Sequence, residues 1–147
     1  MLRRPSHRLR GSRGQSLAEF AIVIPVFLLV VGGIIQFGVI FWGQNTLNQV
    51  VRDTGRWAAT QTDCDPATGT APVVATANAI ATQSALIGSI SGVTVTWTGS
   101  PCPPTDNQDV AWVHIRIDSQ VPIFFPVVPG NGAIFSETEF RMEPLPE

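Results

Sequence analysis

An uninterrupted apolar run constrains this chain more than any other feature of its sequence. The run extends from Phe20 to Trp42, reads FAIVIPVFLLVVGGIIQFGVIFW, and holds no charged residue and one strongly polar residue, Gln36. As a helix rising about 1.5 Å per residue it would reach roughly 34 Å, which is enough to cross a hydrocarbon core of about 30 Å. A buried helix in a small soluble protein is rarely apolar on every face for so long. The run therefore predicts a single transmembrane helix.

Arginines are distributed unequally around this run, which predicts its orientation. Five of them precede residue 15, whereas only Arg52 and Arg56 follow the run closely. Because positive charge stays on the cytoplasmic side, we expect a cytoplasmic N-terminus and an extracytoplasmic body. A secretory signal peptide over residues 1–43 is the less favoured interpretation, since its apolar region would be longer than the usual stretch of roughly 7–15 residues.

The net charge of −2 combines a basic leader with an acidic body. The leader contributes +5, and the remaining four arginines and eleven acids contribute −7, so that +5 − 7 = −2. A nucleic-acid binder would carry its basic face on the folded part, so that class is not expected. The two cysteines, Cys64 and Cys102, both fall in the predicted extracytoplasmic body. In an oxidising compartment they predict one structural disulfide.

Glu19 stands directly before the apolar run, where an unpaired carboxylate is costly. One interpretation places it in the headgroup zone, where it favours the helix N-terminus through the dipole. A second interpretation comes from its neighbours, because Gly14 lies five residues earlier and an arginine-rich leader precedes both. This arrangement resembles the processing site of type IV pilin-like proteins. The resemblance implies that a prepilin peptidase cuts between Gly14 and Gln15, which makes Glu19 the fifth residue of the mature chain.

That spacing has a physical rationale. Cleavage creates an α-amino group at Gln15, which the buried carboxylate of a neighbouring subunit can neutralise when the helices associate in lipid. Gly14 leaves room for a peptidase to approach the backbone.

The resemblance extends beyond the cleavage site, over about residues 13–60. The features that carry it are the Glu19-Phe20 pair, Pro25, the Gln36-Phe37-Gly38 segment and the run VVRDTGRWAA. Together they resemble the N-terminal module of TadE-like proteins of the tight-adherence (Flp) pilus systems, and the C-terminal FSETEFRME resembles the family's last strand. A major pilin usually starts with phenylalanine after the cut, whereas this chain would start with Gln15. The resemblance therefore implies a pseudopilin or minor pilin.

Hydrophobic periodicity predicts an α+β fold with a long N-terminal transmembrane and stalk helix, one further helix and a small antiparallel sheet of three to four strands. The expected division is a basic leader at 1–14, the helix at 15–60 and an extracytoplasmic α+β domain at 61–147. The second helix is expected over 73–87 and strands over 92–98, 110–118 and around 134–142, with an irregular or edge segment at 121–129. The apolar stalk positions, which include Leu47, Val50 and Val51, are expected to pack on the chain's own body rather than to form a seam for partner helices. Phe124 and Phe125 are expected in the core rather than in an exposed patch.

No catalytic or cofactor-binding constellation is evident in the sequence. His114 and Asp118 lie about 13 Å apart along one strand, too far for acid–base work together. Clustered metal ligands are missing, and a calcium site formed by Asp63, Asp65, Asp106 and Asp109 is less favoured than solvated loop acids. We therefore expect no enzyme, no metal and no cofactor.

The favoured function is a structural component of Flp pilus assembly that is inserted in the bacterial inner membrane. Entry into the pilus and a role in priming alone are both compatible with this function. Its expected partners are the prepilin peptidase, other pilins or pseudopilins, the pilus assembly machinery and the lipid bilayer. Gly14 and Gln15 form the expected processing site, and Glu19 and Phe20 the expected assembly residues. The alternative is an uncleaved, single-span membrane-anchored extracytoplasmic binding module.

Overall fold

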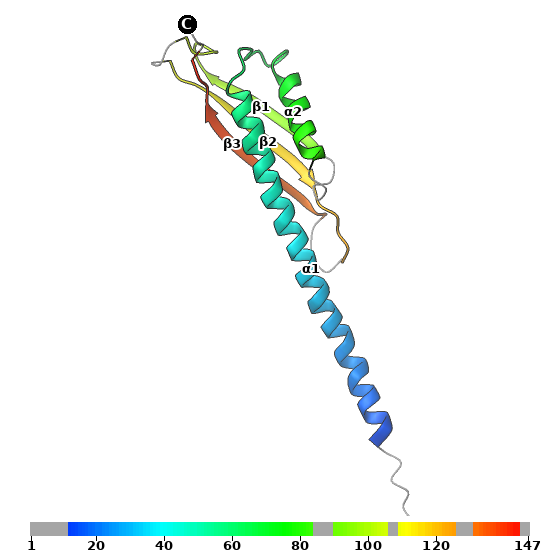
Figure 1. Cartoon of the computed structure of the whole chain (residues 1–147). Helices are drawn as coiled ribbons and strands as arrows, with labels where there is room; N and C mark the ends of the chain where they lie inside the picture. The colour runs from blue at the N-terminus through cyan, green and yellow to red at the C-terminus, as the bar shows by residue number, and fades with distance from the viewer. Residues whose placement is uncertain (1–11, 84–89, 106–108, 126–130, 145–147) are drawn as a thin grey trace, which may run out of the picture.

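A computed structural model describes residues 12–83, 90–105, 109–125 and 131–144. These residues form two helices and three strands: α1 (Ser12–Ala58), α2 (Thr70–Thr82), β1 (Ile90–Gly99), β2 (Ala111–Gln120) and β3 (Ala133–Arg141). Figure 1 shows that α1 projects far beyond the body at its N-terminal half, whereas its C-terminal half lies along the sheet. The predicted α+β class is confirmed.

The helix α1 is 47 residues long, about 70 Å at the usual rise. It continues without a break from the apolar run into the stalk, as the sequence predicts. Its C-terminal half buries one stripe of side chains at helical spacing, which includes Leu47, Val50, Val51, Thr54 and Ala58. This stripe packs on the chain's own sheet, so the preferred interpretation of the stalk is confirmed.

The sheet is antiparallel with the strand order β1-β2-β3. Buried and more exposed side chains alternate along the central strand β2, so the strand has one inner and one outer face. Ala111, Val113, Ile115 and Ile117 are fully buried, while Trp112 is exposed and His114 half-buried on the other face. The buried side chains meet the α1 stripe and thereby form the core of the body.

The second helix covers the end of the core next to β1. Val73, Ala77 and Ala81 recur every four residues and are buried, so one face of α2 packs against α1 and the sheet. The helix begins at Thr70, three residues earlier than expected, and ends at Thr82. The predicted continuation through Ser84 and Ile87 lies largely outside the described residues.

The segment after β2 departs from one prediction. Residues 121–125 are irregular, as Pro122 suggested, but Phe124 is 63% exposed and Phe125 is 37% exposed. The expectation that these two phenylalanines belong to the core is wrong. The core is already filled by β2 and the two helices, and the segment runs along α1 beyond the end of the sheet (Figure 1). The remainder of the predicted edge segment, 126–130, lies outside the described residues.

Candidate functional site

The N-terminal half of α1 carries a continuous exposed apolar surface. Phe20 is 64% exposed, Ile22 is 71% exposed, and most large apolar side chains from Leu17 to Val30 share this exposure. The helix is long and apolar enough to cross a membrane. The core helix of a soluble protein would bury such side chains, and exposed apolar surface of this extent marks contact with lipid or with other proteins.

The predicted processing and assembly residues lie at the tip of this surface. Gly14, Gln15, Glu19 and Phe20 all belong to the first turns of α1, and the side-chain amide Nε2 of Gln15 donates a hydrogen bond to Oε1 of Glu19 over 3.1 Å. Both side chains are exposed, and a Cβ added at Gly14 would meet no atom within 4 Å. No salt bridge joins Glu19 to another residue in the described part of the chain. The carboxylate is therefore presented outward, with a neutral amide as its neighbour.

Gln36 is a residue whose role the sequence did not reveal. It lies within the apolar run, yet its side chain is fully buried. Its Nε2 donates to the carbonyl oxygen of Pro122 at 3.1 Å, and its Oε1 accepts the backbone N–H groups of Phe124 at 2.8 Å and Phe125 at 3.3 Å. The sequence signal for this role was a single amide side chain within a long apolar run. The groups that bind it could not be predicted, because they are distant in sequence.

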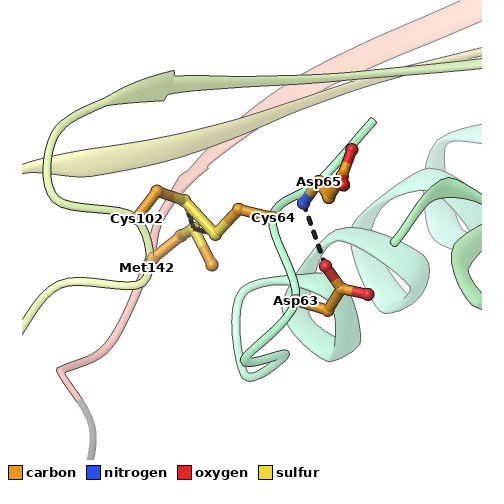
Figure 2. Close-up of a disulfide and its surroundings, with 5 residues drawn as sticks. All are labelled: Asp63, Cys64, Asp65, Cys102 and Met142. Atoms are coloured by element: carbon orange, nitrogen blue, oxygen red, sulfur yellow. Dashed lines mark hydrogen bonds between the residues drawn. A yellow bond between two sulfur atoms is a disulfide. The ribbon is translucent and has the colours of Figure 1, made fainter. Parts of the chain in front are cut away.

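The two cysteines form the disulfide that the sequence predicts. Cys64 and Cys102 are joined across a sequence separation of 38 residues, with a Cα–Cα distance of 5.9 Å. Figure 2 shows the bond tying the loop after α1 to the loop after β1, with Met142 beside it. The sulfur of Met142 lies 3.4 Å from that of Cys102 and 3.7 Å from that of Cys64. Because neither cysteine sulfur carries hydrogen, these are packing contacts around a structural crosslink.

The loop acids near the disulfide are occupied by local backbone hydrogen bonds. Oδ1 of Asp63 accepts the N–H of Asp65 at 3.0 Å (Figure 2), and Oδ1 of Asp65 accepts the N–H of Ala67 at 2.9 Å. A hydrogen bond from the Thr68 side chain and the one from the Asp65 backbone lower the pKa of Asp63 below 3.8. No group of three or more potential metal ligands gathers in the described ranges, and Asp106 lies outside them. The acids act as loop-forming residues.

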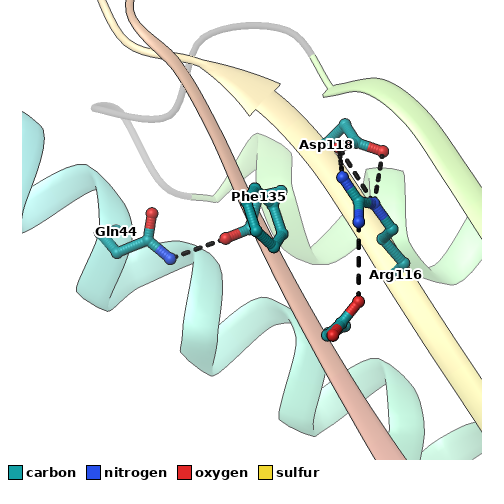
Figure 3. A network of polar contacts seen from close by, with 5 residues as sticks. Gln44, Arg116, Asp118 and Phe135 are labelled. Atoms are coloured by element: carbon teal, nitrogen blue, oxygen red, sulfur yellow. Dashed lines mark hydrogen bonds and ion pairs between the residues drawn. The ribbon is translucent and has the colours of Figure 1, made fainter.

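The sheet face opposite α1 carries a charged cluster rather than a catalytic one. Arg116 pairs with Asp118 at 3.1 Å and with Glu137 at 3.7 Å, and its guanidinium carbon lies 4.3 Å from the centre of the Phe135 ring (Figure 3). The hydrogen bond with Asp118 is the main cause that raises the pKa of Arg116. Asp118 therefore pairs with Arg116 and not with His114. Exposed pairs of this kind stabilise a fold only slightly, so the cluster mainly orders this outer face.

Hydrogen bonds between α1 and β3 hold the helix against the sheet edge. Nε2 of Gln44 donates to the carbonyl oxygen of Phe135 at 2.8 Å (Figure 3), and Oγ of Ser136 donates to Oδ1 of Asn48 at 2.6 Å. Together with the buried stripe they make the C-terminal half of α1 part of the body. The part of α1 from Gly14 to Val30 stays exposed and is available for contacts outside the chain.

Comparison with known proteins bears on the N-terminal region. Residues 14–56 match the model of a family described as TadE-like protein. The resemblance that the sequence predicted is thereby confirmed over most of α1, and the match begins at Gly14 itself. That family is structural and pilus-associated, not an enzyme family. No curated protein and no solved structure matches the chain.

Proposed function

We propose that this chain, whose residues 14–56 match TadE-like proteins, is a pseudopilin of a Flp pilus system that is processed after Gly14. One observation carries the proposal. The family match begins at Gly14, and Glu19 lies five residues later at the exposed tip of a helix whose apolar surface the body leaves uncovered.

The division of α1 into two halves suits a subunit that assembles through its helix. The C-terminal half is fixed to the sheet by the buried stripe and by Gln44 and Asn48. The part of α1 from Gly14 to Val30 stays exposed and can pack against other apolar helices in the bilayer. Helices in lipid associate by close packing and polar contacts, because lipid offers no hydrophobic driving force between them.

Glu19 supplies the polar contact in this scheme. A carboxylate at the membrane edge needs a partner, and its neighbour within the chain is the neutral amide of Gln15. Cleavage after Gly14 provides a positive α-amino group at Gln15. We propose that Glu19 pairs with this group on an adjacent subunit, which would set the register between the helices.

The proposed topology places residues 1–14 in the cytoplasm and the α+β body outside the inner membrane. The arginine-rich leader supports this orientation through the positive-inside rule, and a disulfide between Cys64 and Cys102 suits an oxidising compartment. The proposed partners are a prepilin peptidase, other pilins or pseudopilins and the assembly machinery.

The test is the N-terminus of the membrane-extracted protein after co-expression with its prepilin peptidase, determined by intact mass and terminal peptide mapping. We expect a chain that starts at Gln15 and keeps its α-amino group. A cyclised Gln15 would show the cut but would contradict the pairing with Glu19, since the lactam carries no charge. Gly14→Leu should block the cut, and because nothing lies near Gly14, the substitution leaves the fold unperturbed.

Gly33→Leu is the matched control, since Gly33 also has no atom within 4 Å of an added Cβ. It should be processed normally. A wild-type chain that keeps Arg3 to Arg13 would contradict the proposal and favour an uncleaved, membrane-anchored binding module.

A further inference from the structure

We infer that the segment 121–125 inserts into the outer leaflet beside α1 and presents Phe124 to lipid. It would form a second membrane contact of the body, in addition to the helix. The inference rests on the proposed insertion of α1 in a bilayer.

The depth of the segment follows from its contacts with α1. The N–H of Phe124 reaches Oε1 of Gln36, six residues before Trp42, the last residue of the apolar run. At about 1.5 Å per residue, Gln36 lies about 9 Å below Trp42. If Trp42 marks the interface, where tryptophan is enriched, the backbone of Phe124 lies within the roughly 5–10 Å typical of interfacial elements. The Phe125 ring packs on Gly32, ten residues before Trp42, and so reaches about 15 Å, which is still within the outer half of a hydrocarbon core of about 30 Å.

Three of the four backbone N–H groups in residues 121–125 are paired within the protein. Irregular backbone at membrane depth needs its polar groups satisfied by protein. The N–H of Val121 donates to the carbonyl oxygen of Gly132 at 2.9 Å, and Pro122 has no N–H. The N–H groups of Phe124 and Phe125 donate to Gln36, whereas the N–H of Ile123 has no partner among the described residues. Gln36 also satisfies the carbonyl of Pro122. One buried amide therefore pairs three backbone groups of this segment, which explains a glutamine within the apolar run.

Close packing seats the segment on α1. A Cβ on Gly32 would lie 2.8 Å from the Phe125 ring, and a Cβ on Gly43 would lie 2.3 Å from a methyl group of Val121. The two glycines let the segment approach the helix closely. One side of Phe125 is thereby covered, while Phe124 remains 63% exposed.

The distribution of charge favours lipid as the occupant of this exposed surface. The chain carries no charged residue between Asp118 and Glu137, and none on α1 between Glu19 and Arg52. Ile123 and Phe124 are exposed, as are many large apolar side chains of α1 between Leu17 and Trp42. A soluble partner would meet this surface only outside the bilayer that α1 occupies.

The experiment places a polarity-sensitive fluorophore on the full-length chain in vesicles of phosphatidylethanolamine and phosphatidylglycerol. Phe124→Cys is labelled without reductant, so that the native disulfide stays closed. Phe27→Cys, on the exposed side of the span, reports insertion of α1, and Thr94→Cys, exposed on β1, reports the aqueous body.

We expect the Phe124 probe to be blue-shifted, quenched by lipid-borne quenchers as the Phe27 probe is, and several-fold less accessible to aqueous iodide than the Thr94 probe. A Phe124 probe as aqueous as the Thr94 probe, with the Phe27 probe quenched by lipid, would overturn the inference alone. A blue-shifted Phe124 probe that lipid quenchers do not reach would also overturn it, since a second copy would then cover the surface. Failure of lipid quenching at Phe27 would instead contradict insertion of the helix.

Discussion

Gln36 and Phe124 are joined by a 2.8 Å hydrogen bond across 88 residues of sequence, from the middle of the apolar run to the segment after β2. The bond belongs to a set of three that all end on the Gln36 amide. Together with the hydrogen bonds of Gln44 and Asn48 to β3, it fixes the position of the body along α1.

Gln36→Leu should therefore destabilise the body although leucine suits the apolar run. Two backbone N–H groups and one carbonyl lose their partner, and an orphaned buried group costs about 1–3 kcal/mol. We expect a loss of about 2 kcal/mol or more in the free energy of unfolding, measured by denaturant titration in detergent micelles. Gln44→Leu removes an exposed hydrogen bond from the same helix and should cost about 0.5 kcal/mol. Equal losses in the two variants would contradict this role of Gln36.

Glu19→Gln should prevent assembly without preventing membrane insertion. The substitution keeps the size and polarity of the side chain but removes the charge that is proposed to pair with a neighbour's α-amino group. We expect normal membrane levels and a several-fold loss of the protein's assembly with other subunits, measured by crosslinking in membranes and by piliation. Asp53→Asn, an exposed acid on the same helix, serves as the control and should behave like wild type. Normal assembly and piliation with Glu19→Gln would refute the proposed register mechanism.

Removal of the disulfide should lower stability markedly. The crosslink closes a loop over a separation of 38 residues, for which chain entropy predicts a contribution of about 4 kcal/mol as an upper value. We expect the Cys64→Ala/Cys102→Ala variant to unfold at a clearly lower denaturant concentration than the oxidised protein. Reductant should destabilise the wild type and leave the double variant unchanged. A reductant-insensitive wild type would count against the crosslink.

Thr54→Val should stabilise the body. Thr54 is fully buried on the α1 stripe, and its hydroxyl has no hydrogen-bond partner among the described residues. Replacing the hydroxyl by a methyl group of similar shape removes the desolvation cost, for an expected gain of about 1 kcal/mol. Thr54→Ala removes volume as well and should not show this gain. Denaturant titration of the wild type and the two variants gives the order of their free energies of unfolding. A destabilised Thr54→Val would show that the Thr54 hydroxyl forms a hydrogen bond.

The loop at Asp63 should weaken in acid. Its hydrogen bonds lower the folded-state pKa below 3.8, so the contribution of the carboxylate to stability is present above the unfolded pKa and is lost as pH falls through the folded value. A carboxyl NMR titration should place the pKa of Asp63 below 3.8. Thr68→Val, which removes the largest cause of the shift, should bring the pKa closer to 3.8. An unshifted wild-type value would contradict the hydrogen-bonding scheme.

Local sequence patterns determined most of the fold. The apolar run and the helical spacing that follows predicted one continuous helix, and hydrophobic periodicity predicted the strands, because the side-chain period follows from local geometry. The two cysteines predicted their own pairing, since no other partner exists in the sequence. The spacing from Gly14 to Glu19 is also local, so the sequence could suggest a processing site there, and that site stays a prediction.

Tertiary structure alone decided the surroundings of Gln36, Phe124 and Phe125. Sequence hydrophobicity suggested a core position for the two phenylalanines, and it showed Gln36 as an isolated polar residue. A side chain is buried only where the other elements leave room for it. The core is filled by side chains of β2 and the two helices, so the two phenylalanines lie outside it. Only the folded chain brings Gln36 against the backbone of that segment, since the two are separated by more than eighty residues and no local periodicity links them.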